Sequence, residues 1–195
     1  LRFFNSLDES YNYDTELAVK TFLQAYLACV AFADEQVGKV LDALDASRFK
    51  DNTVVIFISD HGWHVGEKDF LHKNSPWEES IRVPFVIRDP REQGGAQVLH
   101  PISLVDLYPT IVELCGLDGD TQKNANGVEL GGYSLVPFLK KPDTKDWDGP
   151  DGALTVLALG ALSLGSGKID QTYSYRTEEW RYIRYASGRE ELYHH

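Results

Sequence analysis

The feature that most constrains the fold is the run from Thr53 to Ile58, which is rich in β-branched residues and almost uniformly apolar. Such a composition is typical of a strand that is covered on both faces of its sheet. Before it, residues 15–47 carry apolar side chains at helical spacing, with charged side chains between them. A long helix that leads into a buried strand predicts a crossover connection, and therefore an α/β fold with a parallel or mixed sheet.

The rest of the chain shows two kinds of sequence pattern, one mixed α and β and one of short strands. After the strand, the patterns predict a short helix over 77–81, a strand over 83–87 and a helix from Ile102 that Gly116 closes as a C-cap. Pro109 lies either in the first turn of that helix or at a kink. Short, partly alternating runs follow at 153–162, 171–177, 180–185 and 190–193. We expect α/β structure over residues 1–145 and a small antiparallel β-rich subdomain over residues 146–195.

Composition and charge exclude several classes of partner. With 43% hydrophobic and 25% charged residues, the chain should form an ordinary globular core. A formal net charge of -11 argues against nucleic acid, which is bound by clustered Lys and Arg. Cys29 and Cys115 lie in apolar helical positions, which favours two buried thiols over a disulfide.

The ends and the most apolar run add two expectations. The run from Ala153 to Lys168 is broken by glycine and is shorter than the about 20 residues that a membrane helix needs, so we predict a soluble chain with no membrane span. The chain begins without a methionine or a signal peptide, and we expect that it is cut from a longer polypeptide. The terminal His194-His195 is either native or the remnant of a tag.

Ionisable residues gather directly after the apolar run, between Ser59 and Lys73. The carboxyl ends of strands are where α/β sheets bind their ligands. Asp60 and His61 stand next to Gly62, and a carboxylate beside an imidazole could form half of a site for a divalent cation. Alternatively, Asp60 caps a turn and His61 is an ordinary loop histidine. Lys73 either meets an anion as a point charge or lies in solvent, as most lysines do.

A nucleophile is harder to find. The sequence contains no Gly-x-Ser-x-Gly elbow, no phosphate-binding Gly-x-x-x-x-Gly-Lys loop and no His-Glu-x-x-His helix. Cys29 lies in the middle of an apolar helix, which is a poor setting for a reactive thiolate. We therefore expect the nucleophile to lie outside this chain.

The segment ISDHGWHVGEKDFLHK, followed by WEESIRVPFVIR, resembles the type I sulfatases of the alkaline-phosphatase superfamily, especially the branch with iduronate sulfatase and bacterial polysaccharide sulfatases. The family's Ser-Asp-His-Gly-Trp, Gly-Glu and Lys positions are matched by residues 59–63, residues 66–67 and Lys73. Three further blocks resemble the family in the same order: YLACVAFADEQVGKVLDAL, SLVDLYPTIVELCGL and SYRTEEWRYIRYASGREELYHH. The resemblance covers nearly the whole chain and implies part of an alkaline-phosphatase-like mixed or parallel sheet.

The resemblance also implies roles for individual residues. Asp60 and His61 would be ligands of an active-site calcium ion (Ca2+), and Lys73 would contact the sulfate group of the substrate. The family's nucleophile is a formylglycine made within a Cys/Ser-x-Pro-Ser/Ala-x-Arg motif, which this chain lacks. Lys68 and Phe70 occupy positions where relatives often have histidine. We therefore expect the C-terminal half of a sulfatase, inactive without its missing N-terminal segment.

The family further implies a sulfated small molecule or polysaccharide as the substrate, and a periplasmic, lysosomal or secreted location. Two alternatives stay open. The first is a phosphonate or phosphate ester hydrolase of the same superfamily. The second is a non-catalytic binding protein that kept the fold.

Overall fold

The computed structural model describes residues 2–118, 126–128, 131–157 and 171–195. The chain divides into two compact units, Leu1–Arg91 and Glu92–His195. The domain boundary that the sequence suggests after residue 145 remains a prediction.

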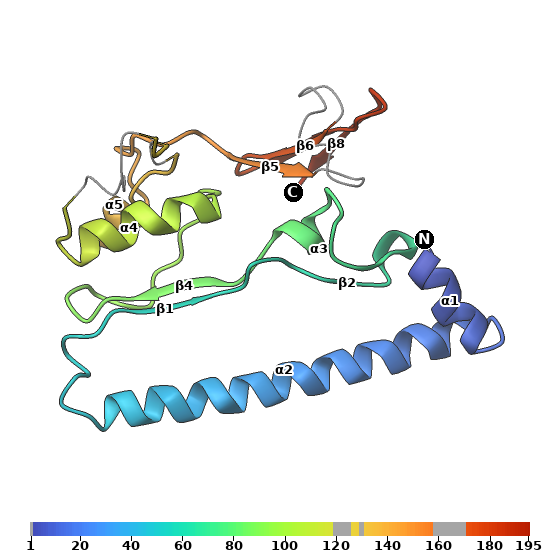
Figure 1. The fold of residues 1–195 in the computed structure, drawn as a ribbon, viewed down its shortest axis with the longest axis horizontal. Helices are drawn as coiled ribbons and strands as arrows, with labels where there is room; N and C mark the ends of the chain where they lie inside the picture. Colours follow the sequence, from blue (N-terminus) through green and yellow to red (C-terminus); the bar gives the residue numbers. More distant parts are fainter. Residues whose placement is uncertain (1, 119–125, 129–130, 158–170) are drawn as a thin grey trace. The chain divides into compact units, whose positions relative to one another are not determined.

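The first unit contains three helices, four strands and a short 3-10 turn among its described residues (Figure 1). In chain order these elements are α1 (Arg2–Ser10), α2 (Thr15–Asp45), β1 (Val55–Ile58), β2 (His64–Val65), η1 (Glu67–Asp69), β3 (Leu71–His72), α3 (Glu78–Ile81) and β4 (Phe85–Arg88). The long helix, the strand after it, the short helix and the next strand all lie within two residues of their predicted bounds. The α1 helix and the β2–β3 hairpin were not predicted.

The α2 helix begins where its sequence signals place it. The side chain of Asp14 caps the helix by accepting a hydrogen bond of 3.1 Å from the amide of Leu17. Its apolar residues are only partly covered, and Leu27 and Val30 are exposed. Cys29 is exposed as well, and so is Cys115, which contradicts the prediction of two buried thiols. Helical spacing correctly indicated an apolar stripe, but it does not show which part of the stripe another element covers.

Strands β1 and β4 form a two-stranded antiparallel ribbon, with Val55 opposite Arg88 and Ile58 opposite Phe85. The predicted parallel crossover is therefore not the pairing seen within this unit. The segment between the strands contains a hairpin and the short α3 helix, and it returns the chain in the opposite direction (Figure 1). Phe57 is 45% exposed, which contradicts the prediction of a strand covered on both faces.

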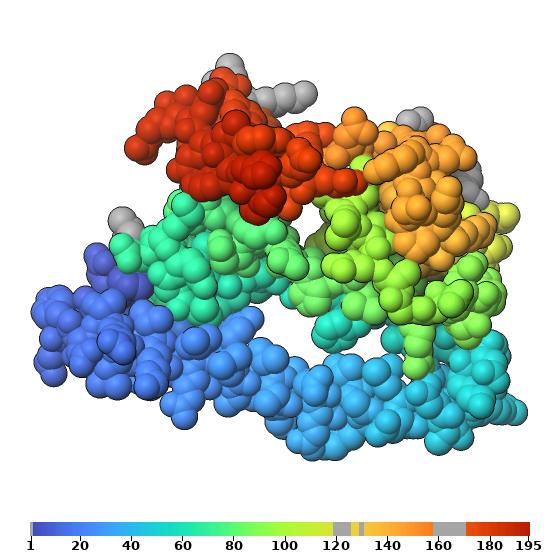
Figure 2. Space-filling model, turned by 180° about the vertical axis from the view of Figure 1, so that it is seen from behind, coloured from blue at the N-terminus to red at the C-terminus, as the bar shows by residue number. Residues whose placement is uncertain are grey.

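The α2 helix runs alongside the β1–β4 ribbon without packing closely on it over its whole length. In Figure 2, open space separates much of α2, in blue, from the teal and green residues of the ribbon. The ion pair between Arg88 of β4 and Asp45 of α2, at 3.0 Å, joins the two at one end. The apolar surfaces of both elements therefore remain largely uncovered within the described residues.

The α2 helix is also long and apolar enough, by length and composition, to cross a membrane. Its uncharged stretch, however, extends only over residues 21–33, between Lys20 and Asp34. A membrane helix needs about 20 residues with few or no charges. This shorter uncharged stretch is compatible with a helix whose apolar side meets protein, and the absence of a membrane span stays a prediction.

The core of the first unit lies around the loop that follows β1. Phe4, Ala18 and Leu71 are buried there, together with the side chain of His64. Gly66 has a φ of 129°, and an added Cβ would lie 3.1 Å from the side chain of Val19 in α2. The loop is therefore held against the first turns of α2 by close packing.

The second unit combines helical segments with a four-stranded sheet. Its elements are η2 (Leu104–Asp106), α4 (Leu107–Leu114), α5 (Val136–Lys140), β5 (Ala153–Leu157), β6 (Thr172–Arg176), β7 (Trp180–Arg184) and β8 (Glu190–His194). Pro109 lies in the first turn of α4, where its missing N–H costs nothing, and Gly116 follows the helix with a φ of 61°. The sheet has the order β5-β6-β7-β8 and is antiparallel throughout, as predicted. The part of the predicted 153–162 strand beyond Leu157 lies outside the described residues.

Candidate functional site

The loop that leaves β1 is tied to α3 by backbone contacts. The amide of Gly62 donates a hydrogen bond of 2.8 Å to the carbonyl oxygen of Ser80. A Cβ at Gly62 would lie 2.0 Å from the carbonyl oxygen of Glu79, so only glycine fits at this close approach. Ser59 bridges the turn, because its hydroxyl donates to the carbonyl of His61 at 2.8 Å. The backbone around Asp60 and His61 is thus fixed from both sides.

Asp60 and His61 lie side by side at the end of β1, as the sequence predicted. The Oδ1 atom of Asp60 is 3.7 Å from Nε2 of His61, and the Asp60 side chain is 86% exposed. The Nδ1 atom of His61 lies 2.8 Å from the carbonyl oxygen of Gly62. A carbonyl can only accept, so Nδ1 carries a proton and donates it, and in the neutral imidazole the lone pair therefore lies on Nε2, on the side of Asp60.

This arrangement has the chemistry of a half-built metal site. A metal-binding histidine usually donates its other ring N–H to a carbonyl or carboxylate, which orients the ring, and His61 already does so. Asp60 adds a carboxylate, the ligand that hard divalent cations prefer. Within the described ranges, no cluster of three or more His, Cys, Asp or Glu side chains could hold a metal ion. Because calcium takes about 6–8 ligands, the residues present fit the ion but cannot enclose it.

Lys73 lies in a loop with an unusual backbone. Its two neighbours, His72 and Asn74, have φ angles of 73° and 71°, although neither is a glycine. Such conformations cost about 1–3 kcal/mol each and collect at functional sites. Among the described residues, Lys73 forms no hydrogen bond or ion pair, so its exposed ammonium group is available to an anion. The structure shows no contact that brings Lys73 to Asp60 or His61.

Aromatic packing holds the chain next to Lys73. The ring of His72 meets the ring of Trp63 edge-on, with centroids 5.0 Å apart, and the ring of Phe3 at 4.5 Å. Trp63 in turn lies 6.1 Å from the ring of His61. Trp63 therefore contacts both His61, a residue of the predicted site, and His72, the neighbour of Lys73.

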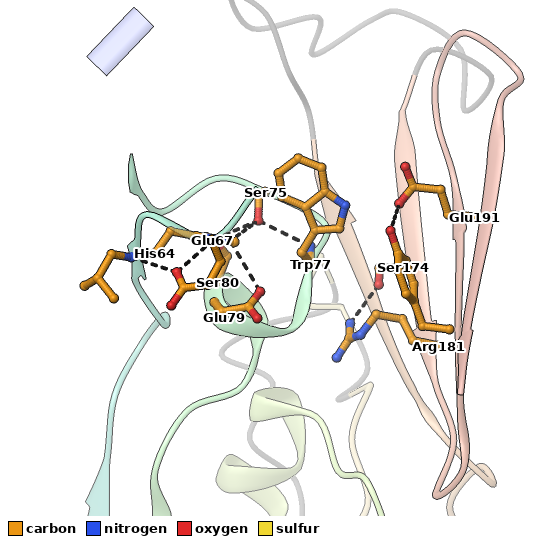
Figure 3. A network of polar contacts seen from close by, with 11 residues as sticks. His64, Glu67, Ser75, Trp77, Glu79, Ser80, Ser174, Arg181 and Glu191 are labelled. Carbon is orange, nitrogen blue, oxygen red and sulfur yellow. Dashed lines mark hydrogen bonds and ion pairs between the residues drawn. The ribbon is translucent and has the colours of Figure 1, made fainter. Parts of the chain in front are cut away.

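His64 is the centre of a buried polar network that the sequence did not reveal (Figure 3). Its side chain is fully buried, and its Nε2 lies 2.7 Å from the hydroxyl of Ser75, which is 2.9 Å from the hydroxyl of Ser80. The hydroxyl of Ser75 also accepts a hydrogen bond from the amide of Trp77. The network ties the β2 strand to the segment that follows Lys73 and leads into α3.

The surroundings of His64 favour the neutral form of its imidazole. Burial lowers the pKa of the imidazole below its usual 6.5, while the carboxylates of Glu79 and Glu67 oppose that shift. Within the part of the chain that the structure describes, the Nδ1 atom accepts or donates no hydrogen bond of normal length, and an oxygen of Glu67 lies 3.7 Å away. Ser75, His64 and Glu67 have the order of a catalytic triad. Ser75 is nevertheless only 3% exposed, whereas a nucleophile must be open to its substrate, so we assign these contacts to holding the loop.

Lys68 and Phe70 pack beside this network. The ammonium of Lys68 lies 5.2 Å from the ring centre of Trp77, a cation–π contact. The ring of Phe70 lies 5.2 Å from His64 and 5.7 Å from Trp77. Both residues thus have a packing role in this chain.

The pattern of the sequence held one signal for the buried network. His64 and Val65 pair with Leu71 and His72 as a hairpin, with His64 opposite His72. Two-residue strands are too short to give an alternating pattern, so the hairpin and the burial of His64 could not be predicted. The one signal was the nearby Ser75-Pro76-Trp77, where a turn residue next to a large aromatic residue indicates that this loop meets a covered surface.

Solved structures share the fold of this chain. The structure of BT4656 in complex with its substrate D-glucosamine-2-N,6-O-disulfate matches with a TM-score of 0.70 and 22% identity, over 97% of this chain and 38% of that one. The phosphonate monoester hydrolase of Agrobacterium radiobacter matches with a TM-score of 0.66 and 27% identity, over 85% of this chain and 33% of that one. The fold class is therefore the alkaline-phosphatase-like α/β class, as predicted.

Sequence comparison narrows this class to one family. The profile of the family described as "Sulfatase" matches residues 2–117. Arylsulfatase K of Xenopus laevis is 34% identical over 176 residues, and an ulvan-active sulfatase of Formosa agariphila is 33% identical over 171 residues. The matches cover 89% and 85% of this chain, but only 31% of each relative. The chain belongs to the sulfatase family, and it spans about a third of the length of these curated relatives.

Proposed function

We propose that the intact protein hydrolyses sulfate esters of carbohydrates. In this proposal, the present chain supplies Asp60 and His61 as ligands of a calcium ion and Lys73 as a sulfate-binding cation. The observation that carries it is the Asp60–His61 pair at the end of β1, with Nδ1 of His61 hydrogen-bonded to a carbonyl and Nε2 on the side of the Asp60 carboxylate. Membership of the sulfatase family gives this pair its chemical context.

Each residue would have a distinct task. When bound, the calcium ion would withdraw charge from the sulfate and help the nucleophile, a formylglycine outside this chain, to ionise. Asp60 would offset the charge of the ion, and His61 would hold a neutral lone pair at a fixed position. Lys73 would bind a sulfate oxygen, and a hydrogen bond of that charged kind is worth about 1.5–3 kcal/mol.

A sulfated carbohydrate is the substrate class that the relatives favour. Two similar proteins are an ulvan-active sulfatase and BT4656, whose substrate is D-glucosamine-2-N,6-O-disulfate. Ulvan and this disulfate are both sulfated carbohydrates, and this chain shares family with the first protein and fold with the second. We therefore propose a sulfated sugar or polysaccharide as the substrate of the intact protein.

The test uses the intact protein with an aryl sulfate and with sulfated oligosaccharides. We expect Asp60→Asn and Lys73→Ala to lower turnover by at least about 100-fold, because each removes charge stabilisation of the kind that typically supplies such factors. Asp51→Asn and Lys50→Ala are matched controls, because both residues are exposed in the turn before β1. Folded site variants that keep full turnover would contradict the proposal.

Metal dependence gives an independent measurement. Chelation should abolish turnover and calcium should restore it, and calorimetry should show weaker calcium binding in Asp60→Asn. An imidazole is an uncommon partner for calcium, so manganese and zinc belong in the same titration. Binding of zinc in preference to calcium would contradict the proposed metal.

A second candidate is phosphonate monoester hydrolysis. It is favoured by the phosphonate monoester hydrolase of Agrobacterium radiobacter, which is 27% identical over the matched region. Assaying the intact protein on aryl sulfates, phosphonate monoesters and phosphodiesters separates the two. Greater kcat/KM on the phosphorus esters would favour this candidate, and absence of turnover on all of them would favour a non-catalytic binding protein.

A further inference from the structure

A surface cavity of about 380 Å³ lies within the second unit, far along the chain from Asp60 and His61. One wall comes from residues 144–151, the loop before β5, and the other from residues 177–180, the turn between β6 and β7. His100 and Phe138 also line it. Its volume lies in the range of about 300–1,000 Å³ that is typical of small-molecule sites.

One aromatic wall of the cavity is held rigidly in place. The indole N–H of Trp147 donates a hydrogen bond of 2.9 Å to the carbonyl oxygen of Ser134. The ring lies directly over the backbone of Gly149, where an added Cβ would be only 2.3 Å from it. Phe138 and His100 support the ring, with centroids 5.1 Å and 5.0 Å away. The apolar wall is therefore built before any ligand arrives.

The opposite wall presents a second indole and free carboxylates. Trp180 begins β7 and is 43% exposed, although its ring also contacts His194. The side chains of Asp151 and Glu179 are exposed and form no hydrogen bond or ion pair with any described residue. Glu178 is already engaged, at 3.4 Å from Lys145. The cavity thus combines two indoles with two carboxylates, those of Asp151 and Glu179, that have no partner among the described residues.

The charges of the cavity restrict what it can bind. Three carboxylates face one ammonium group, that of Lys145, so an anionic ligand such as a sulfate ester would be repelled. These carboxylates do not form a metal-binding group within the described ranges. Indoles suit a ligand with a flat apolar face, and free carboxylates suit one with several hydroxyl donors. An uncharged pyranose ring has both a flat apolar face and several hydroxyl donors.

We propose that this cavity binds an unsulfated pyranose unit of a glycan, stacked on Trp147 and Trp180 and hydrogen-bonded through its hydroxyls to Asp151 and Glu179. The inference rests on the cavity and does not require the proposed sulfatase activity. In a protein that acts on a polysaccharide, such a site would bind the stretches of the polysaccharide that carry no sulfate. It would thereby raise the effective concentration of the polysaccharide at the protein.

The experiment measures binding of neutral tetrasaccharides to the intact protein by calorimetry, using cellotetraose, mannotetraose and galactotetraose. The tetrasaccharide that binds is then tested after chemical O-sulfation, and a glucosamine tetramer is tested beside it. We expect at least one neutral tetrasaccharide to bind and its sulfated form to bind at least about tenfold more weakly. Failure of all three neutral ligands, equal binding of the sulfated form, or binding of the glucosamine tetramer alone would overturn the inference.

Variants locate the site. Trp180→Ala should weaken binding about tenfold, or about 1.4 kcal/mol, because it removes one of the two rings on which the sugar stacks. Tyr182→Ala is the matched control, because it is an exposed aromatic residue on the same face of β7 and does not line the cavity. Asp151→Asn, a change at an exposed position, should weaken binding about threefold by removing a charged acceptor. Equal effects of Trp180→Ala and Tyr182→Ala, or no effect of Asp151→Asn, would overturn the inference.

Activity separates this inference from the proposed function. Hydrolysis of a small aryl sulfate should be the same in Trp180→Ala as in the unmodified protein, because the aryl group is too small to need the cavity. Loss of that activity would place Trp180 in the reaction site and overturn the inference. Saccharide binding by a protein that hydrolyses no sulfate ester would uphold the inference while the proposed function fails.

Discussion

Gly62 carries the tightest constraint in the candidate site, because its Cα faces backbone and not a side chain that can move. Gly62→Ala would place a methyl group 2.0 Å from the carbonyl of Glu79, and the loop would have to shift. We expect a loss of about 1–3 kcal/mol in stability and a larger loss of turnover in the intact protein. Thermal unfolding and aryl sulfate assays measure the two effects.

Gly38 provides the matched control for this prediction. It lies in the middle of α2, and nothing lies within 4 Å of an added Cβ. Gly38→Ala should raise stability by up to about 1 kcal/mol, because alanine favours the helix over glycine. Equal unfolding temperatures for the Gly62 and Gly38 variants would contradict the geometry of the loop.

His64 should make stability depend on pH. Burial lowers its pKa below 6.5, so in the unfolded chain the imidazole takes up a proton at a higher pH than in the folded protein. The stability of the folded form is therefore full above pH 6.5 and falls as the pH drops below that value toward the folded pKa. A His64→Gln variant should show a flatter dependence in this window, measured by denaturant unfolding at several pH values. An unchanged slope would contradict the buried neutral imidazole.

The sequence predicted part of the site at this scale. Asp60 and His61 are adjacent in the chain and follow an apolar strand, so their proximity needs no tertiary information. Their role as metal ligands came from resemblance and stays a prediction, as does the role of Lys73. His64 could not be predicted because its burial depends on Ser75 and Ser80, which reach it only when the loop folds back on itself.

Among the elements, the start of α4 depends on one buried carboxylate. Asp106 accepts hydrogen bonds from the amide of Ser103 at 2.8 Å and from the amide of Tyr133 at 2.9 Å. Asp106→Asn would set an amide NH₂ against one of these donors. We expect a loss of about 1–3 kcal/mol, the cost of an unpaired buried donor, seen as a lower unfolding temperature. Asp148→Asn, at an exposed position, should leave that temperature unchanged, and a similar fall in both would contradict the prediction.

Element positions were predicted well where the pattern was long. The α2 helix has a long apolar periodicity, and the strands of the C-terminal sheet, although short, are bounded by turn residues that mark their ends. The pairing of β1 with β4 was not predicted, because strand direction depends on how residues 59–84 return the chain. The burial of β1 was overestimated for a related reason, since an apolar run shows what a strand can bury and not what covers it.

At the scale of the molecule, the first unit leaves apolar surface on both α2 and the β1–β4 ribbon. Phe57 and Val86, on the ribbon, are 45% and 56% exposed, and Leu27 and Val30 are exposed on α2. Monomeric proteins rarely keep contiguous apolar surface of this kind, so we expect other parts of the intact protein to cover it. The 195 residues produced alone should bind a hydrophobic dye and self-associate.

Cys29 lies on α2 as well, so the rate at which its thiol is alkylated tests whether this surface is covered. It is exposed on α2 here, and it should react with iodoacetamide quickly in the isolated chain and slowly in the intact folded protein. Light scattering and mass spectrometry measure the two properties. A monodisperse isolated chain that binds no dye, or equal alkylation rates in both proteins, would show that nothing covers this surface.

The left-handed backbone conformation of His72 and Asn74, on either side of Lys73, also limits how the protein can be engineered. A search for thermostable variants would select Asn74→Gly, because glycine adopts that conformation without steric cost. The same substitution would make the backbone next to Lys73 more flexible, so the ammonium group of Lys73 would occupy a wider range of positions. Heat resistance and turnover would therefore be selected in opposite directions at this loop.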